Sequence, residues 1–172
     1  MKIGGQSPFP GRVRSREHVL HTRLELPLSI DAVFPFFAAA ENLERITPPE
    51  LRFKILTPTP VEMRLGTLLD YRLSLFGVPF RWHTEIAKWD PPRAFVDVQL
   101  RGPYSLWVHT HTFAETDNGT LIQDHVRYRL PLSPLGELAF PMVRRQLDRI
   151  FSFRRAAVQA ALLDAGPPRE AT

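Results

Sequence analysis

The sequence predicts an α+β domain in which an antiparallel sheet of seven strands wraps around one long C-terminal helix. Seven segments between residues 18 and 130 alternate apolar and polar side chains, which is the period of a strand. After Pro131 the apolar period changes from two residues to 3.6, which is typical of an amphipathic helix. Asn118-Gly119 separates the last two alternating segments, and this dipeptide favours a tight hairpin turn.

The length fits one domain. The chain has 172 residues, enough to bury a sizeable apolar core. We expect a domain over residues 17–165, preceded by a Gly-, Pro- and Arg-rich tail at 1–16 and followed by a short tail at 166–172. Hydrophobic residues make up 44% and charged residues 23%, as in a globular protein. No apolar run approaches the roughly 20 residues of a transmembrane helix, so no integral membrane segment is expected.

Charge and cysteine content exclude several classes of function. The absence of cysteine excludes disulfides, thiolate metal ligands and thiol catalysis. The net charge of +4 comes from 22 basic and 18 acidic residues without a nucleic-acid-binding motif, so no nucleic-acid partner is expected. The first 16 residues lack the apolar stretch of a secretory signal, and we therefore expect a cytoplasmic protein.

The N-terminal part predicts one strand and two short helices. Residues 18–26 alternate as a strand does. Ser29 is a suitable N-cap for a helix that continues through residues 33–37, and Pro35 is tolerated because it lies in the early turns. A second short helix is expected over residues 42–46.

Six more strands follow, separated by turns rich in proline and glycine. The turns expected between them include residues 76–79, 90–93, 102–104 and 118–119. The strands themselves are expected at residues 51–57, 67–75, 80–89, 95–101, 105–113 and 120–130.

One long amphipathic helix is predicted after the last strand. Ser133-Pro134 is a typical helix start, and Pro141 should either kink the helix or split off its first turn. A helix of this length needs a wide apolar surface, and the sheet is the candidate. Its polar face is expected to be solvated, with a membrane surface or an acidic partner as the alternative for its arginines, which are Arg144, Arg145, Arg149, Arg154 and Arg155.

The turn lengths predict which side chains share a face of the sheet, because residues directly opposite in an antiparallel pair point to the same side. They place Ile86 opposite Asp97, Asp97 opposite His109, and Phe113 opposite Asp124. One face then gathers polar and aromatic groups where a plain sheet would bury aliphatic ones. We expect the following residues to line a ligand site there: Tyr71, Trp82, Asp97, Gln99, Trp107, His109, His111, Asp124 and Tyr128.

The opposite face of the sheet is expected to meet solvent. Apolar side chains at Val96, Val98, Leu106 and Val108 interrupt it and suggest a homodimer or another partner surface. On the covered face, each unpaired polar group would cost about 1–3 kcal/mol, more if charged. Those groups must therefore pair with one another, with trapped water or with a ligand.

Several segments carry a resemblance to a known superfamily. They are Val33-Phe34-Pro35-Phe36-Phe37, residues 42–49, Trp89-Asp90-Pro91-Pro92, and residues 95–113 with Gly102-Pro103-Tyr104 at their centre. Over about residues 18–163 the chain resembles the SRPBCC or START-like superfamily, which has the helix-grip fold, and within it the bacterial cyclase/dehydrase-like ligand-binding proteins. The resemblance implies a cavity between the sheet and the C-terminal helix for a hydrophobic or amphipathic small molecule or lipid. It implies no particular reaction and no cofactor.

Three functions are compatible with these residues. The first is binding of the small molecule, for transport or sensing. The second is a polyketide cyclase- or dehydratase-like enzyme that uses His109 or His111 as its acid–base group. The third is a regulatory or interaction module with a filled core and no cavity. The two histidines, with Asp97 or Asp124, also have the chemistry to hold Zn or Fe, but core histidines with hydrogen-bond partners are the commoner outcome, so no metal is expected.

Overall fold

The structure is a computed structural model that describes residues 16–132 and 134–164. The two expected tails lie outside these residues, apart from Arg16, as does Ser133 of the expected helix start. Seven strands form one antiparallel sheet in the order β1-β7-β6-β5-β4-β3-β2. They are β1 (Glu17–Leu26), β2 (Lys54–Ile55), β3 (Leu68–Leu75), β4 (Val78–Asp90), β5 (Ala94–Arg101), β6 (Leu106–Thr116) and β7 (Gly119–Arg129).

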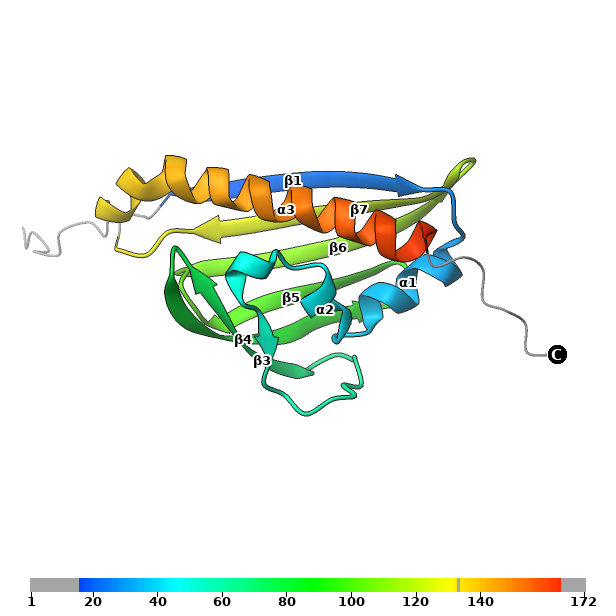
Figure 1. The fold of residues 1–172 in the computed structure, drawn as a ribbon, viewed down its shortest axis with the longest axis horizontal. Coiled ribbons are helices and arrows are strands. Elements are labelled where there is room, and N and C mark those ends of the chain that lie inside the picture. The colour runs from blue at the N-terminus through cyan, green and yellow to red at the C-terminus, as the bar shows by residue number, and fades with distance from the viewer. Residues whose placement is uncertain (1–15, 133, 165–172) are drawn as a thin grey trace, which may run out of the picture.

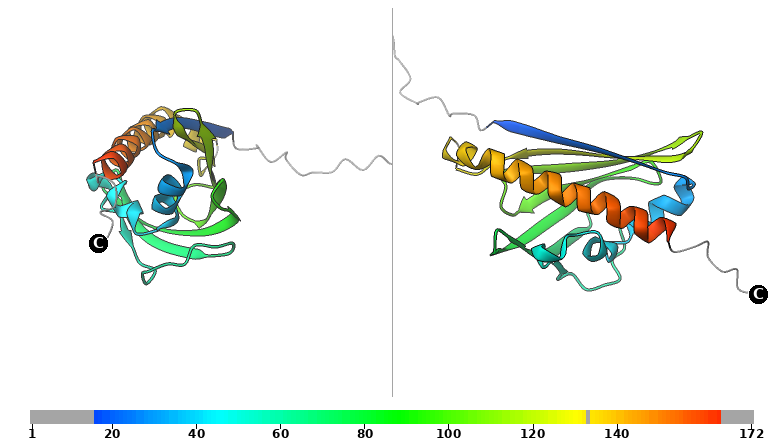
Figure 2. Two further views of the ribbon diagram at one scale, coloured as in Figure 1. Left: turned by 90° about the vertical axis from the view of Figure 1, so that its right-hand side faces the viewer. Right: turned by 45° about the horizontal axis from the view of Figure 1, so that its top comes forward.

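Three α-helices and two short 3-10 turns complete the described chain. They are α1 (Ile30–Ala38), α2 (Asn42–Arg45), η1 (Pro49–Leu51), η2 (Leu135–Ala139) and α3 (Phe140–Leu163). Figure 1 shows α3 lying lengthwise across the sheet, with α1 and α2 near its C-terminal half. Seen along the long axis in Figure 2, the sheet curves around the interior and α3 closes the open side. No described helix is both long and apolar enough to cross a membrane.

The helix starts agree with the expected positions but differ in detail. Ser29 occupies the N-cap of α1 and its carbonyl accepts bonds from the N–H groups of Ala32 and Val33, but its side chain makes no capping bond. Pro141 lies in the first turn of α3, where a missing N–H costs nothing. The turn η2 is therefore separate from α3, in agreement with the expectation that this proline could split off a first turn.

The expected strand over residues 51–57 is wrong for most of its length. Pro49–Leu51 forms a 3-10 turn and Arg52 follows in the left-handed region at φ 46°, so the backbone is not extended there. Only Lys54 and Ile55 pair with β3. Prolines on both sides of the segment restrict the backbone in a way that the alternation of its side chains does not reveal.

The turn between β3 and β4 is shorter than expected. It consists of Phe76 and Gly77, both at positive φ, and Leu75 pairs with Val78. Two consecutive residues at positive φ are typical of a type I′ hairpin. The register differs from the expected one by two residues, so the side chains keep their predicted faces.

The last hairpin also differs by two residues. Thr116 pairs with Gly119, so the turn is Asp117-Asn118, and His111 rather than Phe113 lies opposite Asp124. Gly119 is needed for a close approach, because an added Cβ would lie 2.1 Å from the carbonyl oxygen of Leu26. The glycine thus serves the contact with the end of β1 and not the turn itself.

The central strands agree with the prediction at the site. Ile86 pairs with Asp97, and Asp97 with His109. Register shifts in β4, one of them between Ile86 and Lys88, place Trp89 opposite Phe95 where Ala94 was expected. Such bulges increase the local bend of a strand, and here they help the sheet to curve around its contents.

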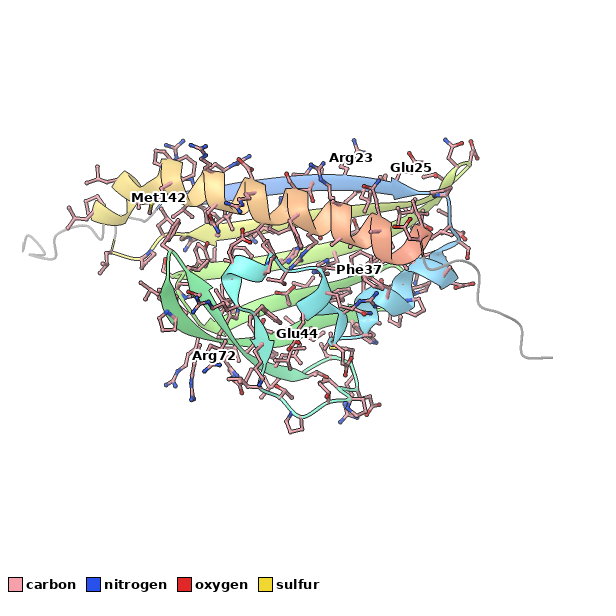
Figure 3. The ribbon with its side chains drawn as sticks, viewed as in Figure 1. Arg23, Glu25, Phe37, Glu44, Arg72 and Met142 are labelled. Carbon is pink, nitrogen blue, oxygen red and sulfur yellow. The ribbon has the colours of Figure 1, made fainter. Side chains whose placement is uncertain are left out.

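Two apolar clusters pack between the sheet and the helices. One contains Phe34, Phe113 and Val158, and the other contains Trp107 and Phe151. The solvent face of the sheet is polar, as Figure 3 shows for Arg72, which projects outward from β3. The inward-facing side chains of β6 extend from Trp107 in the second cluster to Phe113 in the first cluster. The two histidines lie between the clusters.

Candidate functional site

A cavity of about 140 Å³ lies between the inner face of the sheet and α3. Its wall is mainly apolar and comes from the α1–α2 region, from β3 to β6, and from α3. It includes Phe36, Phe37, Leu43, Leu69, Tyr71, Leu73, Trp82, Ile86, Phe95, Tyr104, Trp107, Leu147, Ile150 and Phe151. Three polar groups from adjacent strands form one part of this wall: Asp97 of β5 and His109 and His111 of β6.

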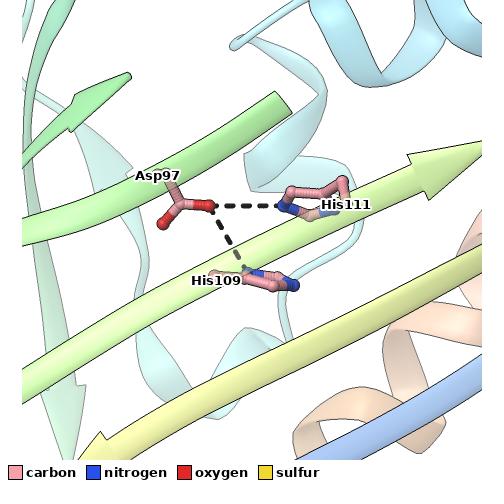
Figure 4. A group of neighbouring side chains, drawn as sticks. All are labelled: Asp97, His109 and His111. Atoms are coloured by element: carbon pink, nitrogen blue, oxygen red, sulfur yellow. Dashed lines mark hydrogen bonds and ion pairs between the residues drawn. The ribbon is translucent and has the colours of Figure 1, made fainter. Parts of the chain in front are cut away.

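These three residues and Asp124 of β7 form a closed network. Asp97 Oδ2 lies 3.3 Å from His111 Nε2 and 3.5 Å from His109 Nδ1, as Figure 4 shows. On the other side, Asp124 Oδ1 lies 3.0 Å from His109 Nε2 and 2.9 Å from His111 Nδ1. The last contact is too bent for a hydrogen bond and is purely electrostatic. Each imidazole is therefore between two carboxylates.

The surroundings of the network hold both imidazoles in place. The ring of Phe95 stacks on His111 with 4.2 Å between centroids, and the His109 and His111 rings are 3.8 Å apart. Phe151 of α3 meets His109 edge-on at 5.5 Å. Both histidines are about 95% buried. Little rotation is left to either ring, so the positions of their nitrogen atoms are set by the fold.

The two histidines differ in their affinity for a proton. Burial lowers the pKa of His109, and the neighbouring His111 lowers it further, which outweighs the carboxylates. Burial also opposes the charge on His111, but Asp124 and Asp97 outweigh it and raise the pKa of His111 above its usual value. The network thus holds a proton donor, His111, beside a proton acceptor, His109.

Both carboxylates remain ionised. Burial would raise the pKa of Asp97, but the two histidines and Arg154 outweigh it and lower that pKa. Burial likewise opposes the charge of Asp124, but hydrogen bonding to His109 and the contact with His111 lower its pKa well below the usual value. Thr22 of β1 also donates a hydrogen bond of 2.9 Å to Asp124 Oδ2.

Comparisons of the whole chain identify its fold. No model of a known protein family matches the sequence, and no curated protein matches it. Solved structures do match. The aromatase/cyclase ZhuI from Streptomyces sp. R1128 is 14% identical over 91% of this chain and all of its own, with a TM-score of 0.72. Norcoclaurine synthase from Thalictrum flavum is 15% identical over the same shares, with a TM-score of 0.67.

A START superfamily protein from Mycobacterium smegmatis is 14% identical over 86% of this chain and 99% of its own, with a TM-score of 0.66. The chain has the START-like helix-grip fold. The predicted fold class is confirmed, and the resemblance that the sequence carries is confirmed as a resemblance of fold. Identities near 15% support the fold alone, so the chemistry of the site must be argued from its own residues.

The cavity wall contains some, but not all, of the residues expected to line it. Tyr71, Trp82 and Trp107 are on its wall, as are Asp97 and both histidines. The structure places the other three behind the wall, in contrast to the expectation. They are Gln99, Asp124 and Tyr128.

Gln99 shapes the loop between β5 and β6. Its Nε2 donates to the carbonyl oxygen of Tyr104 at 2.7 Å, and the N–H of Tyr104 donates back to its Oε1. The side chain passes so close to Gly102 that an added Cβ there would lie 2.3 Å from Oε1. Gln99 therefore holds Tyr104 on the cavity wall, a residue that the sequence reasoning did not select.

Arg154 also lies on the cavity wall, whereas the sequence predicted it on the solvated face of the helix. It was grouped with the arginines of the solvated helix face, but it lines the cavity together with Leu147, Ile150 and Phe151. These four positions have the spacing i, i+3, i+4 and i+7 of one helix face. That spacing was available in the sequence and indicates the inward direction of Arg154.

The network also contains a possible set of metal ligands. In the described part of the chain, Asp97, His109 and His111 each offer one ligand atom, and these atoms lie within 4.8 Å of one another. Two imidazoles and a carboxylate are a donor set used by Zn and Fe. Asp97 Oδ2 also lies within 3.5 Å of one nitrogen atom of each histidine, so these groups act as partners of one another in the structure.

Proposed function

We propose that this protein binds a small hydrophobic or amphipathic molecule in the START-like cavity. The observation that carries the proposal is a largely apolar cavity with one polar wall, built from Asp97, His109 and His111. Pockets of this composition bind ligands through apolar burial and use a few fixed polar groups for orientation. Binding of this kind would serve transport or sensing, and we propose the cytoplasm as its location. The cavity argues against the third alternative, a module with a filled core.

The size of the cavity restricts the ligand. A volume of about 140 Å³ corresponds to roughly five water molecules at about 30 Å³ each. A ligand of comparable size, such as a substituted aromatic ring or a medium-length chain, would fit with little rearrangement. A long lipid would require α3 or the α1–α2 region to move outward.

Filling the cavity tests this proposal. Leu73→Trp adds a large ring at the cavity wall, whereas Arg72→Trp adds the same ring at the adjacent position on the solvent face of β3. We expect Leu73→Trp to abolish binding of indole in calorimetric titrations and Arg72→Trp to retain it. Overpacking costs about 1–3 kcal/mol, so circular dichroism must show that Leu73→Trp is folded. Equal binding by both variants, or no binding by the wild type, would contradict the proposal.

Acid–base catalysis is the second candidate, in the manner of a polyketide cyclase or dehydratase. One observation favours it: the pKa of His111 is raised and that of His109 is lowered, although the rings are adjacent on the cavity wall. Pairs of groups whose pKa values are separated by their surroundings are suited to donate and accept protons in one reaction. His111 would protonate a leaving oxygen and His109 would remove a proton from carbon.

An extract of host metabolites distinguishes catalysis from binding. If the protein is an enzyme, wild-type protein should deplete one compound and produce another, detected by mass spectrometry as a loss of water or a ring closure. His111→Gln should then abolish the conversion. If the protein only binds, His111→Gln should weaken retention of a co-purified compound modestly and no conversion should occur with either form.

We also propose that the protein forms a homodimer through the solvent side of the sheet. Val96, Val98 and Val108 are half-buried on that side of β5 and β6, as is Leu106. They form the apolar area on which the expectation was based.

A further inference from the structure

The charges around the cavity are unevenly partnered. Asp97 and Asp124 each contact both histidines, and Asp124 also accepts from Thr22. Arg154 lines the same cavity, yet within the described residues no carboxylate lies within ion-pair distance of it and its Nε has no hydrogen-bond partner. Both carboxylates thus have partners in the network, whereas the guanidinium of Arg154 has no carboxylate partner among the described residues.

Other arginines of α3 show what a structural role would look like. Arg144 forms an ion pair with Asp148 at 3.1 Å, and Arg149 forms one with Glu50 at 2.7 Å. Both pairs are on the outside of the molecule. Arg154 instead lies over the ring of Phe151, with its guanidinium carbon 5.2 Å from the ring centroid. This contact holds the guanidinium over the ring, and its Nε–H has no hydrogen-bond partner among the described residues.

The wall of the same cavity offers a further unused donor. The indole nitrogen of Trp82 is buried, belongs to a residue of the cavity wall and has no partner among the described residues. An indole N–H can only donate. A guanidinium and an indole N–H together provide donors without a matching acceptor, and an acceptor-rich group on a ligand would satisfy them.

From these observations we infer that the ligand carries a carboxylate, which Arg154 binds from α3 while the apolar part fills the cavity. This inference rests on the proposed ligand-binding function and specifies its ligand class as small aromatic or aliphatic acids. Guanidinium and carboxylate are geometrically matched and bond in a bidentate manner. The carboxylate on the same wall, Asp97, already has partners, because its Oδ2 lies 3.3 Å from His111 Nε2 and 3.5 Å from His109 Nδ1.

Matched acids and amides test the inference without knowledge of the natural ligand. The probes are benzoate, cinnamate and octanoate, each paired with its carboxamide, which has the same shape and no charge. We expect wild-type protein to bind at least one acid about ten- to a hundredfold more tightly than its amide, because a charge-assisted bond contributes about 1.5–3 kcal/mol. The aromatic and aliphatic pairs show which kind of acid is preferred.

The variants are Arg154→Gln and, as a control, Arg155→Gln at the exposed neighbouring position. Arg154→Gln should reduce the preference for the acid to near unity, because it should weaken acid binding far more than amide binding. Arg155→Gln should retain the preference. If the amides bind and wild-type protein shows no preference, or if Arg154→Gln preserves it, the carboxylate inference is wrong while ligand binding stands. If no probe of either kind binds, both are overturned.

Discussion

The two faces of the sheet both carry histidine–aspartate pairs, and the pairs differ in their relation to water. On the solvent face, His83 Nδ1 of β4 lies 2.8 Å from Asp70 Oδ1 of β3. On the inner face, His109 Nε2 lies 3.0 Å from Asp124 Oδ1. The distances are nearly the same. The side chains of the outer pair are 27% and 57% exposed, however, and those of the inner pair 5% and 10%.

A short contact therefore does not by itself indicate a functional charge. Water can replace either partner of the outer pair at little cost, so the pair contributes little to stability. The inner groups have lost water, and each needs its protein partners to remain charged. For that reason the inner network has more than one contact per group, and its two histidines acquire different proton affinities.

The largest expected effect comes from removing one carboxylate on each face. Asp124→Asn should lower the free energy of unfolding by about 3 kcal/mol, because it deprives two buried imidazoles of their shared partner. Asp70→Asn, the matched change on the solvent face, should lower it by less than about 1 kcal/mol. Chemical denaturation of the three proteins measures both values. Similar losses for the two variants would show that burial does not separate the pairs.

The faces of the sheet were predictable from the sequence, and the exact neighbours were not. Residues keep their faces when a turn differs in length by an even number of residues. The errors of two residues at Phe76-Gly77 and Asn118-Gly119 therefore left Asp97, His109 and His111 on their predicted side. Neighbours depend on the register itself. Asp124 was expected opposite Phe113, and its position opposite His111 follows from the two-residue turn at Asp117-Asn118.

Features that depend on distant parts of the chain were the hardest to predict. The contact of Gly119 with Leu26 joins two segments far apart in the sequence, and no local pattern announces it. The expected strand over residues 51–57 is reduced to the short β2, because the backbone at Arg52 is left-handed. Arg154 is a different case, because its helical spacing from Leu147 and Phe151 indicated the cavity and its charge suggested solvent. The structure shows that the spacing was the better guide.

The dependence of stability on pH should also differ between the two faces of the sheet, with a smaller effect. The pKa of His111 is raised in the folded protein, so the folded state binds this proton more tightly than the unfolded state. The resulting stabilisation is fully present below the usual histidine pKa of 6.5 and is lost as the pH rises through the raised value. The two carboxylates affect stability at acidic pH. The pKa values of Asp97 and Asp124 are lowered, so their contribution to the free energy of unfolding is lost only as the pH falls below 3.8.

His111→Gln should therefore lower the melting temperature more at pH 5.5 than at pH 9, by a few degrees at about 2–4 °C per kcal/mol. The lowered pKa of His109 works in the opposite direction below 6.5, and His111 is one cause of that lowering, so the difference between wild type and variant measures the coupled pair. His83→Gln serves as the solvent-face control and should shift the melting temperature little at any pH, because its partner is exposed. A His111→Gln difference that stays constant from pH 5.5 to 9 would mean that the buried network holds no extra proton.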